Sequence, residues 1–167
     1  MSPFSTWTDI ANTALTHTAV ALTQTTQFRA VVQSGVCPIA NSAVTTVTVD
    51  PTSIAGSVAG GTTICSGSTS GTLTLSGQTG TVVKWQSSVS PFSTWADITH
   101  TALTYTSIAL TQTTQFRAVV QSGVCPIANS AVTTVTVDPT SVGGAVTGGT
   151  TICSGNTSGT LTLAGQT

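Results

Sequence analysis

Apolar and polar residues alternate along several short stretches of the chain with a period of two residues. The clearest stretches are residues 71–76 and 113–121, where every second side chain is apolar. This period is typical of a β-strand that has one face buried and one face in water. The residues expected to point inward from these two strands are Leu73, Leu75, Phe116, Ala118 and Val120, while Arg117, Val119 and Gln121 are expected outside.

Further strands are expected at residues 54–58, 62–65, 81–87, 94–98, 101–110 and 131–137. In the strand expected at residues 81–87, Val83 and Trp85 are expected inside, with Val82, Lys84 and Gln86 outside. Leu103 and Tyr105 should share one face of the strand at 101–110. No stretch has the 3.6-residue period of a helix, so essentially no helix is expected. Six to eight short strands, spaced about 8–12 residues apart with turn residues between them, predict a β-sandwich with Trp85 at its centre.

The chain repeats itself. Residues 1–79 align with residues 89–167 at a constant offset of 88, without a gap, and only 13 of these 79 pairs differ. Residues 80–88, which carry Trp85, have no counterpart. The chain therefore contains one repeat unit and most of a second, so we expect all-β repeats in tandem.

Proline marks the expected unit boundaries. Asp50-Pro51 and Asp138-Pro139 each follow a strongly alternating stretch. Proline cannot donate a hydrogen bond to a strand ladder and disfavours a helical conformation at the residue before it, so these sites read as linkers. Residues 51–138 are then one complete domain. Residues 1–50 are the C-terminal part of a preceding domain, and residues 139–167 are the N-terminal part of a following one.

Composition excludes several classes of partner. Charged residues make up 4% of the chain, the formal net charge is −1, and Glu is absent. The chain therefore has no basic patch for nucleic acid and no polybasic signal for a membrane surface. No apolar run approaches the ~18 residues of a membrane span. The 38 threonines, with many valines, favour strands over disorder.

Four isolated cysteines form no metal-binding or redox pair of the CxxC kind. One disulfide per domain in an oxidising compartment is the simplest interpretation. The favoured pairing joins Cys65 to Cys125, which leaves Cys37 and Cys153 to pair with neighbouring units or chains. The pairing of Cys37 with Cys65 and of Cys125 with Cys153 stays open, as do free thiols.

Comparison of the two copies tests for chemistry, because a reaction performed by each unit should keep its residues in both. His17 stands opposite Tyr105, and His100 stands opposite Asn12, so neither histidine recurs. There is no GxSxG nucleophile motif and no closely spaced carboxylate pair. We therefore expect no enzyme activity, no cofactor and no metal site.

Two weaker alternatives concern aromatic residues and the linker aspartates. Trp7, Trp95 and Phe92 could stack on sugars, although packing in the core or between domains is the simpler expectation. Asp50 and Asp138 could contribute to a calcium site at a junction, but a role in capping or turn formation beside proline fits better.

Several residue patterns together resemble a known family. They are Ile64-Cys65-Ser66-Gly67, Gly71-Thr72-Leu73-Thr74-Leu75, Trp85, Phe116-Arg117-Ala118-Val119-Val120, Gly123-Val124-Cys125 and Val135-Thr136-Val137. The unit resembles the immunoglobulin-like repeats found in tandem in very large secreted surface proteins of Bacteroidetes-type bacteria. This resemblance implies an extracellular location, a stalk-forming role in adhesion, and one cysteine pair per domain.

The expected function is therefore structural. Residues 139–167 contain the first strands of a unit and residues 1–50 the later ones, so head-to-tail association would bring the two parts together. An incomplete sandwich exposes strand edges, which attract strands from other chains. We expect an extracellular stalk or filament built by self-association of units, with no membrane insertion. The alternative is a module that binds a surface glycan or a protein.

Overall fold

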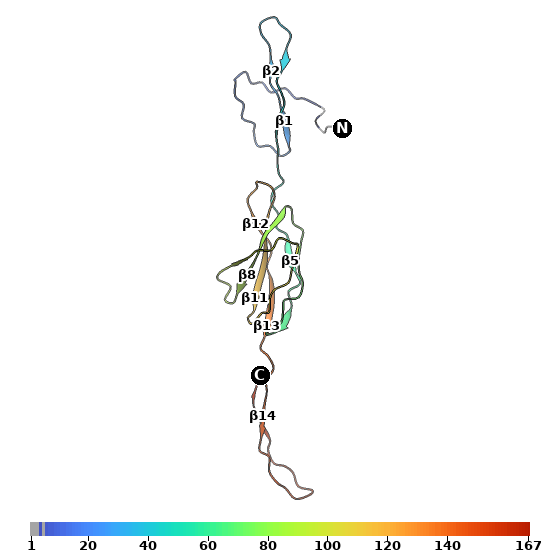
Figure 1. The fold of residues 1–167 in the computed structure, drawn as a ribbon, viewed down its shortest axis with the longest axis vertical. Coiled ribbons are helices and arrows are strands. Elements are labelled where there is room, and N and C mark those ends of the chain that lie inside the picture. The colour runs from blue at the N-terminus through green and yellow to red at the C-terminus, as the bar shows by residue number, and fades with distance from the viewer. Residues whose placement is uncertain (1–3, 5) are drawn as a thin grey trace.

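The strands form three parts that follow one another along one long axis (Figure 1). The computed structural model describes residues 4 and 6–167. The middle part consists of residues 51–138, and the chain enters it at one end and leaves it at the opposite end. No helix occurs among the described residues, which confirms the all-β expectation.

The middle part is a sandwich of two sheets. The smaller sheet has the order β10 (Thr104–Tyr105), β7 (Leu73–Ser76) and β5 (Ser57–Ala59). The larger sheet has the order β6 (Thr63–Cys65), β13 (Thr133–Asp138), β11 (Thr114–Gln121), β8 (Thr81–Val89) and β9 (Ala96–Ile98), and β12 (Ala128–Asn129) also pairs with β11. Neighbouring strands are antiparallel except β6 and β13, which are parallel.

One hydrophobic core lies between the two sheets. Its buried members are Ala55, Val58, Leu73, Leu75, Val82, Trp85, Phe116, Ala118, Val120 and Val135. Leu73, Leu75, Trp85, Phe116 and Val120 thus lie in the core, as expected. Trp85 is completely buried at its centre, and its Nε1 donates a hydrogen bond to the carbonyl of Ala102 at 2.9 Å. The ring of Tyr105 packs against Trp85 with centroids 5.6 Å apart.

The inward and outward sides of β8 differ from the expectation at Val82 and Val83. Val82 is buried and Val83 is exposed, because the register between β8 and β11 shifts there. Val119 pairs with Lys84 and Val120 pairs with Val82, so Val83 is the extra residue of a β-bulge. Strict alternation through residues 81–87 was therefore wrong at its first two valines.

Three further expectations need correction. Val119, expected outside, is buried because β12 pairs with β11 at this point and flanks it opposite β8. The strand expected at residues 101–110 is reduced to β10, and Leu103 is exposed whereas Tyr105 packs against the core. The strand β8 also runs on to Val89, into the segment expected to be a loop.

Two buried serines connect the segment before β7 with the loop after β10. The amide of Ser70 donates to Ser107 Oγ, and the amide of Ser107 donates to Ser70 Oγ, both at 2.9 Å. Each hydroxyl also donates to the next carbonyl along the chain, at 2.8 Å for Ser70 and 2.7 Å for Ser107. This reciprocal arrangement, here called the serine clasp, satisfies two buried amides without a strand ladder.

The two flanking parts keep the strand pairings of the middle part. In the first, β1 (Thr26–Phe28) pairs with β4 (Thr45–Val47), and β2 (Val31–Val32) pairs with β3 (Ala40–Asn41). In the last, β14 (Gly143–Thr147) pairs with β15 (Thr162–Gln166). These registers match, after the 88-residue offset, those of β11 with β13, β11 with β12, and β5 with β7. Each flanking part is therefore a correctly paired fraction of the same unit.

The flanking parts expose the side chains that the middle part buries. Val32 is 59% exposed, whereas its counterpart Val120 is 0% exposed. Leu161 is 53% exposed, whereas its counterpart Leu73 is 0% exposed. In the middle part, Leu73 and Val120 belong to one core. The two flanking parts thus present opposite sides of the core that a complete unit closes.

Candidate functional site

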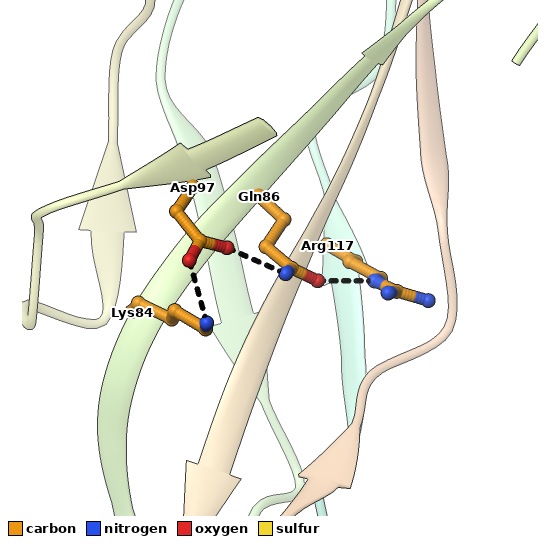
Figure 2. Close-up of polar contacts among 4 residues, drawn as sticks. All are labelled: Lys84, Gln86, Asp97 and Arg117. Carbon is orange, nitrogen blue, oxygen red and sulfur yellow. Dashed lines mark hydrogen bonds and ion pairs between the residues drawn. The ribbon is translucent and has the colours of Figure 1, made fainter. Parts of the chain in front are cut away.

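The first candidate is a polar ladder on the outer face of β8, β9 and β11 (Figure 2). Strand register places Gln86 beside both Asp97 and Arg117. Lys84 Nζ lies 2.7 Å from Asp97 Oδ2, and Gln86 Nε2 donates to Asp97 Oδ1 at 2.7 Å. Arg117 Nε donates to Gln86 Oε1 at 2.8 Å. The hydrogen bond from Gln86, followed by that from Lys84, holds the pKa of Asp97 below its usual range.

Trp95 lies at the end of this ladder. The Arg117 guanidinium carbon is 4.0 Å from the centroid of the Trp95 ring, a cation–π contact. The first copy repeats it, with Arg29 4.1 Å from the centroid of Trp7. Trp7 and Trp95 therefore do not belong to the core, and each ring is already covered on one side by arginine. The ladder's chemistry is cross-strand pairing, which holds β9 to the rest of the sheet.

The second candidate is the junction between the first and middle parts. The carboxylate of Asp50 accepts a hydrogen bond from the amide of Val124 at 3.1 Å, and Ser53 Oγ accepts one from the amide of Ser122 at 2.9 Å. Cys125 Sγ lies 3.6 Å from the carbonyl oxygen of Asp50 and 3.4 Å from that of Pro51. We call Asp50, Ser53 and the turn Ser122–Cys125 the junction latch, since together they attach the linker to the unit that follows it.

Glycine makes the latch possible. Gly123 has φ +49°, and a Cβ built there would meet the carboxylate of Asp50. Its counterpart Gly35 has φ +54°, with nothing within 4 Å of its built Cβ. The turn Ser34–Cys37 is thus the counterpart of the turn Ser122–Cys125, but no linker packs against its glycine. The linker beginning at Asp138 is likewise a second copy of the linker, and no hydrogen bond of its carboxylate occurs among the described residues.

The four cysteines are free thiols in the structure. The favoured pair, Cys65 and Cys125, is not brought together. Cys65 stands opposite Asp138 in the ladder of β6 and β13, where the chain leaves the unit. Cys125 contacts Asp50 and Pro51, where the chain enters it. The two thiols therefore lie at opposite ends of the sandwich.

An apolar cleft opens at the same place in both copies. In the middle part it has a volume of about 270 Å³ and lies between the end of β8 and the segment after β10. Its apolar lining residues are Val89, Ile98, Tyr105, Ile108, Leu110 and Phe116. The first part has a cleft of about 330 Å³, and its seven lining residues are the counterparts of seven residues that line the cleft of the middle part. Three of these seven positions differ between copies, whereas residues 21–53 and 109–141 are identical.

The residues considered for catalysis do not gather. His100 Nε2 bonds the carbonyl of Thr104 at 2.7 Å, and His17 Nδ1 lies 3.2 Å from Asn12 Nδ2. Within the part of the chain that the structure describes, no group of three or more His, Cys, Asp or Glu could hold a metal ion. Over the same residues, no helix is long and apolar enough to cross a bilayer.

Comparison with protein families gives one match. The model described as "Domain of unknown function (DUF8696)" matches residues 2–51 and 54–139. The chain belongs to this family. The two matched segments of the DUF8696 family end at equivalent prolines, 88 residues apart, so the family model follows the repeat. No curated protein and no solved structure matches the chain.

Sequence reasoning missed the latch as a contact. It assigned Asp50 a capping or turn-forming role beside its own proline, whereas the carboxylate caps a turn 74 residues further along the chain. The available signal was that the sequences Asp-Pro-Thr-Ser and Ser-Gly-Val-Cys recur unchanged in both copies. Identity alone could not show that these two segments meet.

Proposed function

We propose that the chain is a structural segment of an extracellular stalk or filament, in which all-β units stack end to end. The units resemble immunoglobulin-like domains and serve adhesion by holding a binding end away from a cell surface. The observation that carries this proposal is the complementarity of the flanking parts. Each keeps some of the strand pairings of a complete unit, yet exposes the apolar residues that the other part of a unit would cover.

The junction latch supports an ordered stack over a flexible chain of domains. Two hydrogen bonds attach the linker to the turn of the next unit, and the linker contains proline, which restricts backbone rotation. The middle part also receives and releases the chain at opposite ends (Figure 1), so successive units extend along one direction. The four cysteines and the low charge agree with an oxidising location outside the cell.

A chain with three consecutive copies of residues 51–138 tests this proposal. Small-angle X-ray scattering should give a rod whose length grows by a constant increment per unit. A control in which Asp138 of each copy is replaced by Ala should keep folded units but bend at the junctions. A compact particle, or units that move independently before any substitution, would contradict the stalk.

A chain that joins with other copies is a variant of the same proposal. Residues 139–167 of one copy and residues 1–50 of another would together supply all of a unit except the counterpart of residues 80–88, which carry Trp85. Size-exclusion chromatography separates this variant from a single long chain. A monodisperse 16.6 kDa monomer would rule out joining between copies.

Protein binding is a second candidate function, favoured by the recurring apolar cleft. The cleft suits an apolar side chain of a protein better than a sugar, which needs polar groups. Its lining differs between copies at Tyr105, Ser107 and Ile108, as expected if units select different partners. Partner proteins captured by the chain should be lost on Ile108→Asp but kept on Ile127→Asp, at an exposed residue outside both the cleft and the junction latch. Equal loss in both variants would reject the cleft.

A further inference from the structure

Cysteines approach the Asp-Pro linker from both of its sides. Where the chain leaves the middle part, the amide of Ser66, next to Cys65, donates to the carbonyl oxygen of Asp138 at 2.9 Å. Where the chain enters it, Cys125 Sγ lies 3.6 Å from the carbonyl oxygen of Asp50. Asp50 and Asp138 are the same position of the repeat. Between two complete units, a single oxygen would therefore have both contacts.

These contacts place the segments that carry two cysteines against the same linker position. In a stack, the amide nitrogen of Ser66 and the Sγ of the next unit's counterpart of Cys125 both contact the carbonyl oxygen of the linker aspartate, at 2.9 Å and 3.6 Å. These two atoms can therefore be no farther apart than the sum of these two distances. Cys65 itself stands directly opposite the linker aspartate in a parallel ladder, where strands are about 4.8 Å apart. A disulfide requires Cα atoms roughly 4.4–6.8 Å apart. The spacing of Cys65 from the linker aspartate falls within this range, and the same linker position contacts the thiol of the other cysteine.

We propose that a disulfide crosses each junction between consecutive units. Cys65 pairs with the counterpart of Cys125 in the unit that follows, and Cys125 pairs with the counterpart of Cys65 in the unit that precedes. This inference rests on the stacking of units in the proposed function. It also means that none of the four cysteines has its partner within residues 1–167, in agreement with four free thiols.

Pairings within the chain do not share this geometry. A bridge from Cys65 to Cys125 would have to span the sandwich from its exit end to its entry end. Cys37 lies in the turn after β2 and Cys65 at the exit of the middle part, with most of the middle part between them (Figure 1). Only the crossing pair places both thiols beside the same linker residue.

The bridge forms by thiol–disulfide exchange with a small-molecule disulfide such as oxidised glutathione. One cysteine thiolate attacks the oxidant, forms a mixed disulfide and releases one reduced thiol. The second cysteine thiolate displaces the other half of the oxidant and completes the S–S bond. Two cysteine thiols are oxidised, one disulfide is reduced to two thiols, and the two protons of the cysteines end on the released thiols.

The partner unit is either the continuation of a longer chain or a second copy. In the second case, residues 151–153 of one copy take the place of β6 beside Val49 and Asp50 of the other. Cys153 of the first copy then faces Cys125 of the other copy, and Cys65 of the first copy faces Cys37 of the other copy. Both sources use the same pair of positions in the repeat, so the pairing can be tested apart from the source.

The decisive experiment uses the full chain extended at its C-terminus by a second copy of residues 80–138, which completes the unit that begins at Pro139. It is refolded with reduced and oxidised glutathione and digested without reductant. Trypsin cleaves after Arg29, Lys84 and Arg117, the only basic residues of the original chain, and at their added copies. A pairing of Cys65 with the added counterpart of Cys125 then links a different pair of fragments from a pairing of Cys65 with Cys125 or Cys153.

The expected product is fragment 30–84 linked to the final added fragment 118–138, with two hydrogens fewer than the separate fragments. Cys65→Ser should remove this product, and the matched control Cys153→Ser should leave it intact. A link from fragment 30–84 to the fragment that carries Cys125 and Cys153 would overturn the proposal. So would free thiols at all positions.

Small-angle X-ray scattering from the same chain in reductant separates the disulfide hypothesis from the hypothesis that units stack end to end. A straight rod with free thiols would overturn the bridge and leave the stack in place, whereas independently moving units would contradict the stack itself. The original chain, oxidised without extension, identifies the source. A link between two 30–84 fragments and another between two 118–167 fragments indicates a second copy, and a monomer with free thiols indicates a continuing chain.

Discussion

Replacing Ser107 by Ala should destabilise the middle part although the change removes only one oxygen atom. The Ser107 hydroxyl accepts from the amide of Ser70 and donates to the carbonyl of Ile108. Ser70 is 0% exposed, so its amide would have no water to replace the lost acceptor. Leaving one buried donor unsatisfied costs about 1–3 kcal/mol. A domain has only about 5–15 kcal/mol of stability, so this loss is readily measured.

The assay is urea unfolding of the full chain, followed by tryptophan fluorescence, in which Trp85 is the fully buried reporter. With a denaturant slope of about 1–3 kcal/mol per molar, the midpoint should fall by on the order of 1 M. Ser70→Ala should have a similar effect, because it removes the acceptor for the amide of Ser107. The double variant should cost less than the sum of the two, since the residues share one clasp.

Ser88→Ala is the matched control. Ser88 is as buried as the clasp serines, at 1% exposure, but its Oγ makes no hydrogen bond within the described structure. Its removal should leave the midpoint unchanged or raise it, because a buried hydroxyl without a partner gains nothing. If Ser107→Ala and Ser88→Ala shift the midpoint equally, hydrogen bonding in the clasp does not determine its stability, and the reasoning fails.

Three further predictions address the core, the latch and the ladder. Trp85→Ala should lower the unfolding free energy by about 3–5 kcal/mol in a urea titration followed by circular dichroism, because the side chain is fully buried; a loss below about 1 kcal/mol would contradict its central position. Gly123→Ala and Gly35→Ala both strain a left-handed residue, but only the first should expose latch amides to hydrogen exchange, since only Gly123 faces the linker carboxylate; equal exchange in both would argue against the latch. Asp97, whose pKa is lowered chiefly by the hydrogen bond from Gln86, should contribute stability above the ordinary carboxyl pKa of about 3.9 and lose it as pH falls through the lower folded value. Asp97→Asn should flatten this acidic loss in urea midpoints measured from pH 7 to pH 2, and an unchanged profile would contradict the ladder's electrostatics.

Period-two alternation was sufficient to locate the core strands because each has one buried face. It failed where a strand departs from a simple ladder. Val83 lies in a bulge, which adds one residue and reverses the alternation before it. Val119 is buried because β12 pairs beside it, and nothing in the two residues Ala128 and Asn129 indicates a strand. Bulges and short edge strands depend on the partner strand, which a local pattern does not contain.

The repeat indicated the unit boundaries, but it could not place the cysteines. Spacing along the chain made Cys65 and Cys125 plausible partners within one unit. Their separation in space depends on β6, which follows β5 of the smaller sheet along the chain but pairs with β13 of the larger sheet at the exit end. The latch was hidden for the same reason, because Asp50 and Val124 meet only when the linker folds back onto the next turn.

The parallel pairing of β6 with β13 has a mechanical consequence. Tension applied along the long axis pulls Asp138 away from the point where the chain enters the unit. Because β6 runs beside β13 in the same direction, this pull slides the two strands past each other. The hydrogen bonds between β6 and β13 along Thr63–Cys65 then bear the tension at the same time and must break together. A hairpin pulled at its open end would instead lose its hydrogen bonds one after another.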